Sequence, residues 1–145
     1  MNIQTRNFGE IEVQEDKIIL FKEGIPGFEE LHKFIFLESE NNMFFYLQSV
    51  EDKDISFVMI NPYQYKKDYA PIISEEYFEK LGGGNDEEFA LYNIVCLREP
   101  MSESTVNLAG PLVIHIEKKL GIQVVTEQKM YSHKQNLVSL IKEGK

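Results

Sequence analysis

Apolar residues in this chain recur with a period of two rather than 3.6, in short runs that polar or turn-forming segments separate. The runs cover residues 17–21, 33–37, 43–50, 55–60, 89–97, 113–116 and 122–126. Short runs rich in Ile, Val and Phe are typical of β-strands. The chain is therefore predicted to be mainly β.

Large side chains lie on both faces of the predicted strands. Within the run 43–50, one face carries Met43, Phe45 and Leu47, and the other carries Phe44, Tyr46 and Val50. An antiparallel sheet with one face in water would alternate apolar with polar residues instead. Bulk on both faces favours a closed architecture with covering segments, and we expect a small, partly open antiparallel β-barrel.

The connections between the runs carry recognisable turn and helix features. The polar link 51–54 predicts an antiparallel hairpin, and Pro62 ends the following run because proline has no N–H for a ladder. One short helix is predicted after Ser74, its capping residue, and before Gly82, its stop. The tail 131–141 fits either a helix or a barrel edge.

The length of 145 residues fits a single domain, residues 1–145, because domains cluster at ~100–150 residues. The formal net charge is −9, from 24 acidic and 15 basic side chains. This charge repels phosphate backbones, so direct nucleic-acid binding is not expected, although Lys66 and Lys67 lie among aromatic residues. Two interpretations of the acidity stay open: attraction of a basic partner, or solubility alone.

No feature of the chain predicts export or membrane insertion. Its start lacks the basic and then apolar layout of a signal peptide, and no apolar stretch approaches the ~18–20 residues that span a bilayer. The single cysteine, Cys96, follows an apolar run and is expected to be a buried, inert thiol. We expect a cytoplasmic protein without membrane contact.

Motifs of catalysis and metal binding are missing from the sequence. The glycine triplet 82–84 is followed by acidic residues rather than the Lys and Ser or Thr of a phosphate-binding loop. His32, His115 and His133 are dispersed, and the pair His115 and Glu117 is interpreted as a surface contact. No Gly-x-Ser-x-Gly nucleophile motif occurs. We therefore expect neither an enzyme nor a cofactor.

Four local patterns stand in order along the chain. They are Gly24-Ile25-Pro26-Gly27-Phe28, Leu47-Gln48-Ser49, Phe57-Val58 running to Asn61-Pro62, and Val106-Asn107-Leu108-Ala109-Gly110-Pro111, with a weaker echo in Tyr131-Ser132. In this order and spacing they resemble the bacterial flagellar assembly factor family FliW, over nearly the whole chain.

Each pattern also has a physical interpretation in which it shapes the fold. Pro26 and Gly27 meet the demands of a type II turn, which Phe28 would pin to the barrel. Gln48 and Ser49 can satisfy backbone groups at the start of the hairpin. Asn107 can bond the chain across the following Gly-Pro break. The residues interpreted as structural are Gly24, Pro26, Gly27, Phe28, Leu47, Gln48, Ser49, Pro62, Leu108 and Pro111.

The resemblance implies a protein that binds two partners in turn. One is CsrA, a small basic dimer that represses translation of the flagellin message, and which the family antagonises allosterically. The other is flagellin itself. The candidate contact residues are Asp52, Asp54, Glu75, Glu76, Asp86, Glu87, Glu88 and Asn107. Two alternatives stay open: a chaperone that binds flagellin only, and a small-ligand barrel, which would require an empty apolar cavity.

Overall fold

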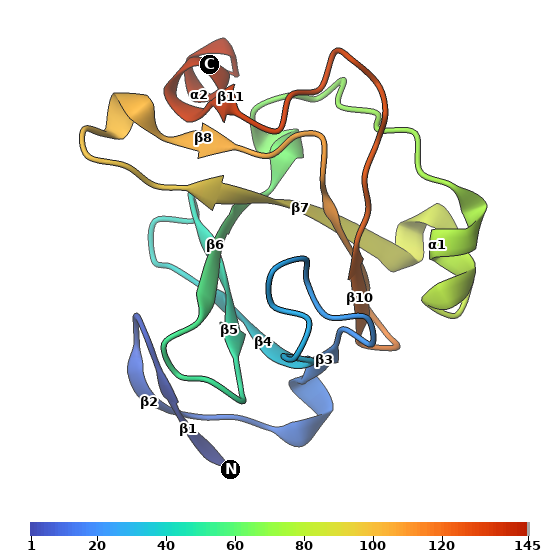
Figure 1. Cartoon of the computed structure of the whole chain (residues 1–145). Helices are drawn as coiled ribbons and strands as arrows, with labels where there is room; N and C mark the ends of the chain where they lie inside the picture. Colours follow the sequence, from blue (N-terminus) through green and yellow to red (C-terminus); the bar gives the residue numbers. More distant parts are fainter. Residues whose placement is uncertain (145) are drawn as a thin grey trace.

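Seven strands of the computed structural model, which describes residues 1–144, form a closed barrel (Figure 1). The strands are β3 (Ile19–Leu20), β4 (Lys33–Glu38), β5 (Phe45–Ser49), β6 (Ser56–Ile60), β7 (Phe89–Cys96), β9 (Leu112–His115) and β10 (Leu120–Gln123). They pair in the order β7-β6-β5-β4-β3-β10-β9, and β9 pairs with β7 to complete the ring. The small antiparallel barrel predicted from the sequence is confirmed, as is the hairpin at 51–54.

One strand pairing in the ring differs from the others. All of its pairings are antiparallel except β10 with β3, which is parallel and consists of the single pair Leu120 and Leu20. Strand β3 is only two residues long, because the chain before it turns into the 3-10 helix η1 (Glu15–Lys17). The barrel wall is therefore thin between β4 and β9.

Side chains fill the inside of the barrel. The inner cluster consists of Ile19, Phe21, Ile25, Phe34, Phe45, Leu47, Met59, Leu112 and Ile114. The opposite face of β6 and β7 carries a second cluster, to which Ile60 and Val95 contribute. Bulk on both faces of β6 and β7 thus serves two apolar clusters, one inside the ring and one outside it.

Two short helices cover the outer face (Figure 1). Helix α1 (Glu75–Lys80) lies over a cluster that includes Val113 of β9 and Ile122 of β10. Helix α2 (Leu137–Glu143) covers the second cluster beside the two-residue strands β8 (Thr105–Val106) and β11 (Gln135–Asn136). The ambiguous tail of the chain therefore ends as a helix.

Helix α1 ends as predicted but begins differently. Gly82 has φ +95°, and the N–H groups of Gly82 and Gly83 donate to the carbonyls of Glu79 and Phe78, which is a Schellman motif. Ser74 occupies the N-cap position, but its side chain makes no capping hydrogen bond. The prediction of a serine cap was wrong in this respect.

An N-terminal hairpin lies beside the barrel and was not predicted. It consists of β1 (Asn2–Thr5) and β2 (Gly9–Glu12), which pair only with each other. Three further 3-10 helices connect the strands: η2 (Pro62–Gln64), η3 (Asp86–Glu88) and η4 (Met101–Glu103). No helix within residues 1–144 has the length and apolar character to cross a membrane.

Cys96 is exposed, which contradicts the expectation of a buried thiol. It is the last residue of β7, where the strand has run past the barrel and pairs with β8. Strand alternation places the preceding residue, Val95, in the core and leaves Cys96 facing outward.

Candidate partner-binding surface

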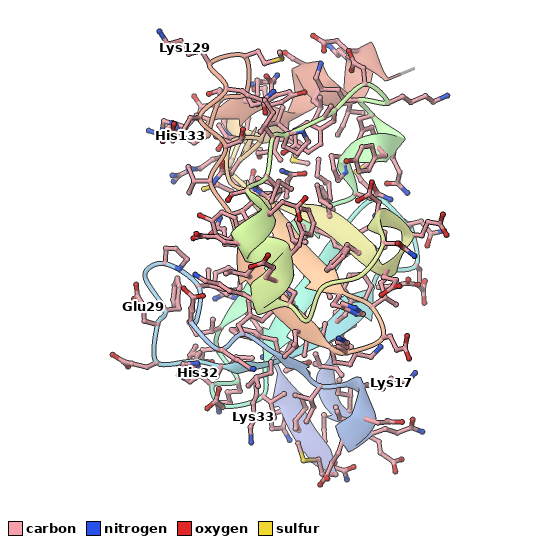
Figure 2. The ribbon with its side chains drawn as sticks, turned by 90° about the vertical axis from the view of Figure 1, so that its right-hand side faces the viewer. Lys17, Glu29, His32, Lys33, Lys129 and His133 are labelled. Carbon is pink, nitrogen blue, oxygen red and sulfur yellow. The ribbon has the colours of Figure 1, made fainter. Side chains whose placement is uncertain are left out.

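Five of the predicted contact residues lie on one side of the barrel, where α1 and η3 pack together. The rings of Phe78 in α1 and Phe89 after η3 meet edge to face, with 5.0 Å between their centroids. This contact holds the first turn of α1 beside η3, on the side that faces the viewer in Figure 2. The residues it brings to this face are Glu75, Glu76, Asp86, Glu87 and Glu88. We call this surface the α1–η3 face.

Two cations lie near the α1–η3 face, and its five carboxylates outnumber them. Lys80 Nζ lies 3.2 Å from the carboxylate of Glu23, and Lys118 Nζ donates to the carbonyl of Gly82 over 2.7 Å. Glu75, Glu76, Asp86 and Glu87 are exposed. The face therefore presents a surplus of negative charge to solvent.

Glu88 differs from its neighbours because it is half-buried against a histidine. Its Oε2 lies 3.2 Å from Nε2 of His115, which is fully buried. His115 Nδ1 accepts a hydrogen bond from the backbone N–H of Lys118 over 3.1 Å, whereas Nε2 makes no hydrogen bond within residues 1–144 although Glu88 lies close to it. The interpretation of His115 and Glu117 as a surface pair was wrong: His115 lies in the barrel wall and its acidic neighbour is Glu88.

Asp52 and Asp54 lie apart from the α1–η3 face, in the link between β5 and β6. The carboxylate of Asp52 accepts from the N–H of Asp54 over 3.0 Å, and the carbonyl of Asp54 accepts from Arg6 over 3.0 Å. Both aspartates are exposed. In the ring, β7 and β6 separate this link from β9, which α1 covers. The structure therefore divides the predicted acidic residues between two surfaces.

Glu51, next to Asp52 in the same link, binds the start of β4. Burial acts to raise the pKa of Glu51, but its Oε1 accepts from the N–H groups of Lys33 (2.9 Å) and His32 (2.6 Å). These bonds, together with the positive charge of the two side chains, lower its pKa overall. This carboxylate serves the link rather than a partner.

Gln48 and Ser49 satisfy the backbone of the link and are themselves buried. Gln48 Nε2 lies within 3.1–3.2 Å of the carbonyls of Ser49, Lys53 and Ile55, and its Oε1 accepts from the N–H of Arg6 over 3.0 Å. Ser49 Oγ accepts from the N–H groups of Glu51 and Asp52. Gln48 thereby ties the N-terminal hairpin to the barrel.

The turn after β3 has the geometry that its sequence predicts. The N–H of Phe28 donates to the carbonyl of Ile25 over 2.7 Å across Pro26 and Gly27, and Gly27 has φ +89°. The ring of Phe28 lies edge to face with Phe57, with 5.1 Å between centroids. This contact holds the turn against β6.

Asn107 is half-buried, and its hydrogen bonds run from its backbone to β7 rather than from its side chain across the Gly-Pro break, as had been expected. Its carbonyl accepts from Asn93 Nδ2 over 2.9 Å, whereas its Oδ1 has no hydrogen-bond partner among residues 1–144. The next residue, Leu108, accepts at its carbonyl from the hydroxyl of Tyr69 over 2.6 Å. Asn107 lies outside both acidic surfaces, and its role in partner binding stays a prediction.

Two sequence patterns meet around Tyr69. The N–H of Leu108 donates to the carbonyl of Ser132 over 2.9 Å, and the rings of Tyr69 and Tyr131 lie edge to face at 4.8 Å. Burial raises the pKa of Tyr69 strongly, so its hydroxyl keeps its proton and donates to Leu108. Sequence reasoning missed Tyr69 and Asn93, which join segments far apart in the chain.

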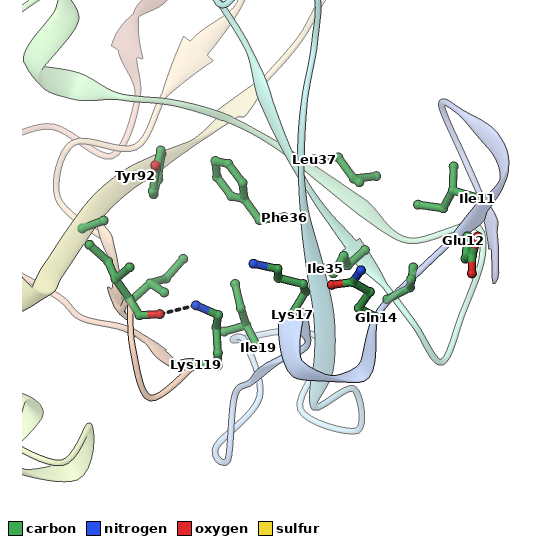
Figure 3. A pocket seen from close by; sticks show the side chains of 14 residues that line it. Ile11, Glu12, Gln14, Lys17, Ile19, Ile35, Phe36, Leu37, Tyr92 and Lys119 are labelled. Atoms are coloured by element: carbon green, nitrogen blue, oxygen red, sulfur yellow. Dashed lines mark hydrogen bonds between the residues drawn. The ribbon is translucent and has the colours of Figure 1, made fainter. Parts of the chain in front are cut away.

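A groove of about 610 Å³ lies where the barrel wall is thin (Figure 3). The N-terminal segment forms one side of it with Ile11 and Val13, and β4 forms another with three consecutive residues, 35–37. Tyr92 and Ile114 contribute to the remaining apolar lining, and Lys17 and Lys119 add positive charge. No sequence pattern indicated this groove, because it depends on where β3 begins.

The closed barrel with its two covering helices defines a small, mainly β class of fold with an acidic outer face. Comparison with known proteins gives it a family. The family model described as "FliW protein" matches residues 2–137. The flagellar assembly factor FliW of Caldicellulosiruptor bescii is 42% identical over 129 residues, which cover 89% of this chain and 85% of that protein. The corresponding protein of Clostridium novyi is 37% identical over 145 residues, which cover 99% of each chain.

A solved structure agrees with these relatives. The crystal structure described as that of the flagellar assembly factor FliW superposes with a TM-score of 0.88 at 35% identity, over 94% of this chain and 96% of that one. The chain therefore belongs to the FliW family of flagellar assembly factors.

Proposed function

We propose that this protein is a cytoplasmic binding module that antagonises the translational repressor CsrA and also binds flagellin, with the two partners alternating. The observation that carries the proposal is the gathering of exposed carboxylates on the α1–η3 face of a FliW-family barrel. CsrA, as the family resemblance describes it, is a basic dimer, so this face is complementary to it in charge.

The charge acts in two ways. A net charge of −9 raises the rate of encounter with a basic partner, and the increase weakens as salt screens it. Once the complex has formed, the same carboxylates disfavour RNA beside the bound repressor. Antagonism therefore does not require that the protein cover the RNA-binding surface of CsrA.

Two matched variants test which acidic surface matters. Each of the pairs Asp86→Asn with Glu87→Gln and Asp52→Asn with Asp54→Asn removes two exposed charges, one pair from each surface. We expect the first pair to slow association with CsrA about threefold to tenfold at low salt and to flatten its salt dependence. The second pair should leave both close to the unsubstituted protein. Stopped-flow or surface-plasmon measurements at two salt concentrations give the rates.

The outcomes separate the possibilities. If the Asp52 and Asp54 pair alone slows association, the contact lies at the β5–β6 link and the α1–η3 face is not the site. If neither pair matters, and the variant with all five carboxylates neutralised also behaves normally, charge attraction is not part of the mechanism. Titration with CsrA in the presence and absence of flagellin tests the alternation directly, since a chaperone that binds flagellin only would ignore CsrA.

A further inference from the structure

The edge of β4 that faces the groove is unpaired beyond Phe34. Lys33 accepts from the N–H of Val50 at its carbonyl, and the N–H of Ser39 donates to the carbonyl of Phe44. Residues of odd number in β4 therefore bond toward β5, because antiparallel pairs alternate between the two edges. Phe34 and Phe36 direct their N–H and C=O groups to the opposite edge.

Strand β3 covers only the first part of that edge. It pairs with β4 at Ile19 with Phe34 and at Leu20 with Lys33, and no further. The residues that precede β3, Ile18 and Lys17, do not continue the pairing. Their N–H groups donate to the carbonyls of Glu15 and Gln14 instead, within and beside η1. Among residues 1–144 no strand pairs with Phe36 on this side, so its N–H and C=O face the groove.

The groove has the other features that an added strand requires. Its lining is mostly apolar, and the half-buried rings of Phe36 and Tyr92 lie 5.0 Å apart between centroids. Lys17 and Lys119 lie on the same side of β4 as these rings (Figure 3), and Lys119 Nζ donates to the carbonyl of Ile116. An extended peptide could pair with the free edge, place apolar side chains on the lining and bring a carboxylate to the lysines.

We propose that this groove receives an extended segment of flagellin, which adds as a strand beside Phe36 and completes the wall that β3 leaves short. The proposal rests on the function proposed above. Of the two partners, the basic CsrA suits a groove lined by Lys17 and Lys119 poorly, whereas flagellin has apolar assembly surfaces. The segment carries alternating apolar residues and one acidic residue.

Residue-resolved amide hydrogen exchange tests the strand pairing. In the free protein the amide of Phe36 should exchange quickly, while that of Leu37, which bonds toward β5, should be protected already. Saturating monomeric flagellin should slow exchange at Phe36 at least tenfold and leave Leu37 nearly unchanged. Leu37 thus serves as an internal control from the same strand.

A charge variant supplies a second measurement. Lys17→Glu should weaken flagellin binding about threefold to tenfold at low salt, whereas Lys129→Glu, outside the groove, should have little effect. Flagellin that binds without slowing exchange at Phe36 would overturn this proposal and leave the proposed function intact. Protection of Phe36 by CsrA instead of flagellin would also overturn it. If flagellin does not bind at all, the proposed function fails together with the strand pairing.

Discussion

Replacing Gln48 by leucine removes the side chain that joins the β5–β6 link to the N-terminal hairpin. The two amide hydrogens of Gln48 serve the carbonyls of Ser49, Lys53 and Ile55, and its oxygen accepts from Arg6. Leucine has a similar volume but neither donates nor accepts, so these backbone groups lose their partner. The apolar core itself stays filled.

The cost can be worked out from the surroundings of each group. The Ser49 carbonyl belongs to a residue that is 1% exposed and so becomes a buried orphan, which costs about 1–3 kcal/mol. Lys53 and Arg6 are exposed, so water can replace Gln48 there, and each lost bond costs about 0.5–1 kcal/mol. The Ile55 carbonyl keeps the N–H of Ser49. The expected destabilisation is about 2–5 kcal/mol, or a fall in Tm of roughly 6–15 °C.

Urea unfolding followed by far-UV circular dichroism measures this loss. Gln4→Leu is a matched control, because Gln4 is exposed and its side chain bonds only to Glu10; it should change stability by less than about 0.5 kcal/mol. A Gln48→Leu protein within about 0.5 kcal/mol of the unsubstituted one would refute the assignment of Gln48 as a buried structural residue.

Two further predictions concern turns and acids. Gly24→Ala and Gly9→Ala both place a side chain at φ near +69°, at a cost of about 1–2 kcal/mol. Only at Gly24 would the new Cβ also clash, at 2.6 Å from the Cα of Glu29. Chemical denaturation should therefore show a distinctly larger loss of stability for Gly24→Ala. The lowered pKa of Glu51 contributes stability above its unfolded value of 4.5, and the contribution disappears as the pH falls through the folded value. Solvent screening limits the stability difference between the unsubstituted protein and Glu51→Gln to less than about 1 kcal/mol. This difference should shrink on acidification, and an increase would contradict the assignment.

The strands of the ring were predictable because each carries its own periodicity. Both faces of the run 43–50 are apolar: Phe45 and Leu47 fill the barrel interior, and on the other face Phe44 packs against the outer cluster and Tyr46 against Phe8 of the hairpin. The end of α1 was predictable for a similar reason, since the conformation at Gly82 is one that glycine adopts easily. Neighbouring residues are enough to predict an element whose structure depends on contacts within that element.

The features that sequence reasoning missed depend on distant parts of the chain. The N-terminal hairpin has few apolar residues, and Gln48, 42 residues away from Arg6, helps to hold it in place. His115 was expected at the surface, but Glu88 of η3 and the ring of Phe89 lie against it. The two acidic surfaces could not be separated either, since their spacing in the sequence says nothing about which strands lie between them.

The sequence patterns that reveal the family are mostly unable to touch a partner. Leu47, Gln48, Ser49, Leu108 and Pro111 are all buried, and their contacts join strands and loops of the same chain. Buried residues of this kind specify the barrel, and a partner could reach them only if the barrel opened. Recognition must then be carried by exposed residues, on surfaces such as the α1–η3 face and the free edge of β4, and Pro26, Gly27 and Phe28 of the first pattern are also exposed. A resemblance built on the patterns therefore identifies the scaffold, whereas the contacts have to be located from charge, exposure and unpaired backbone.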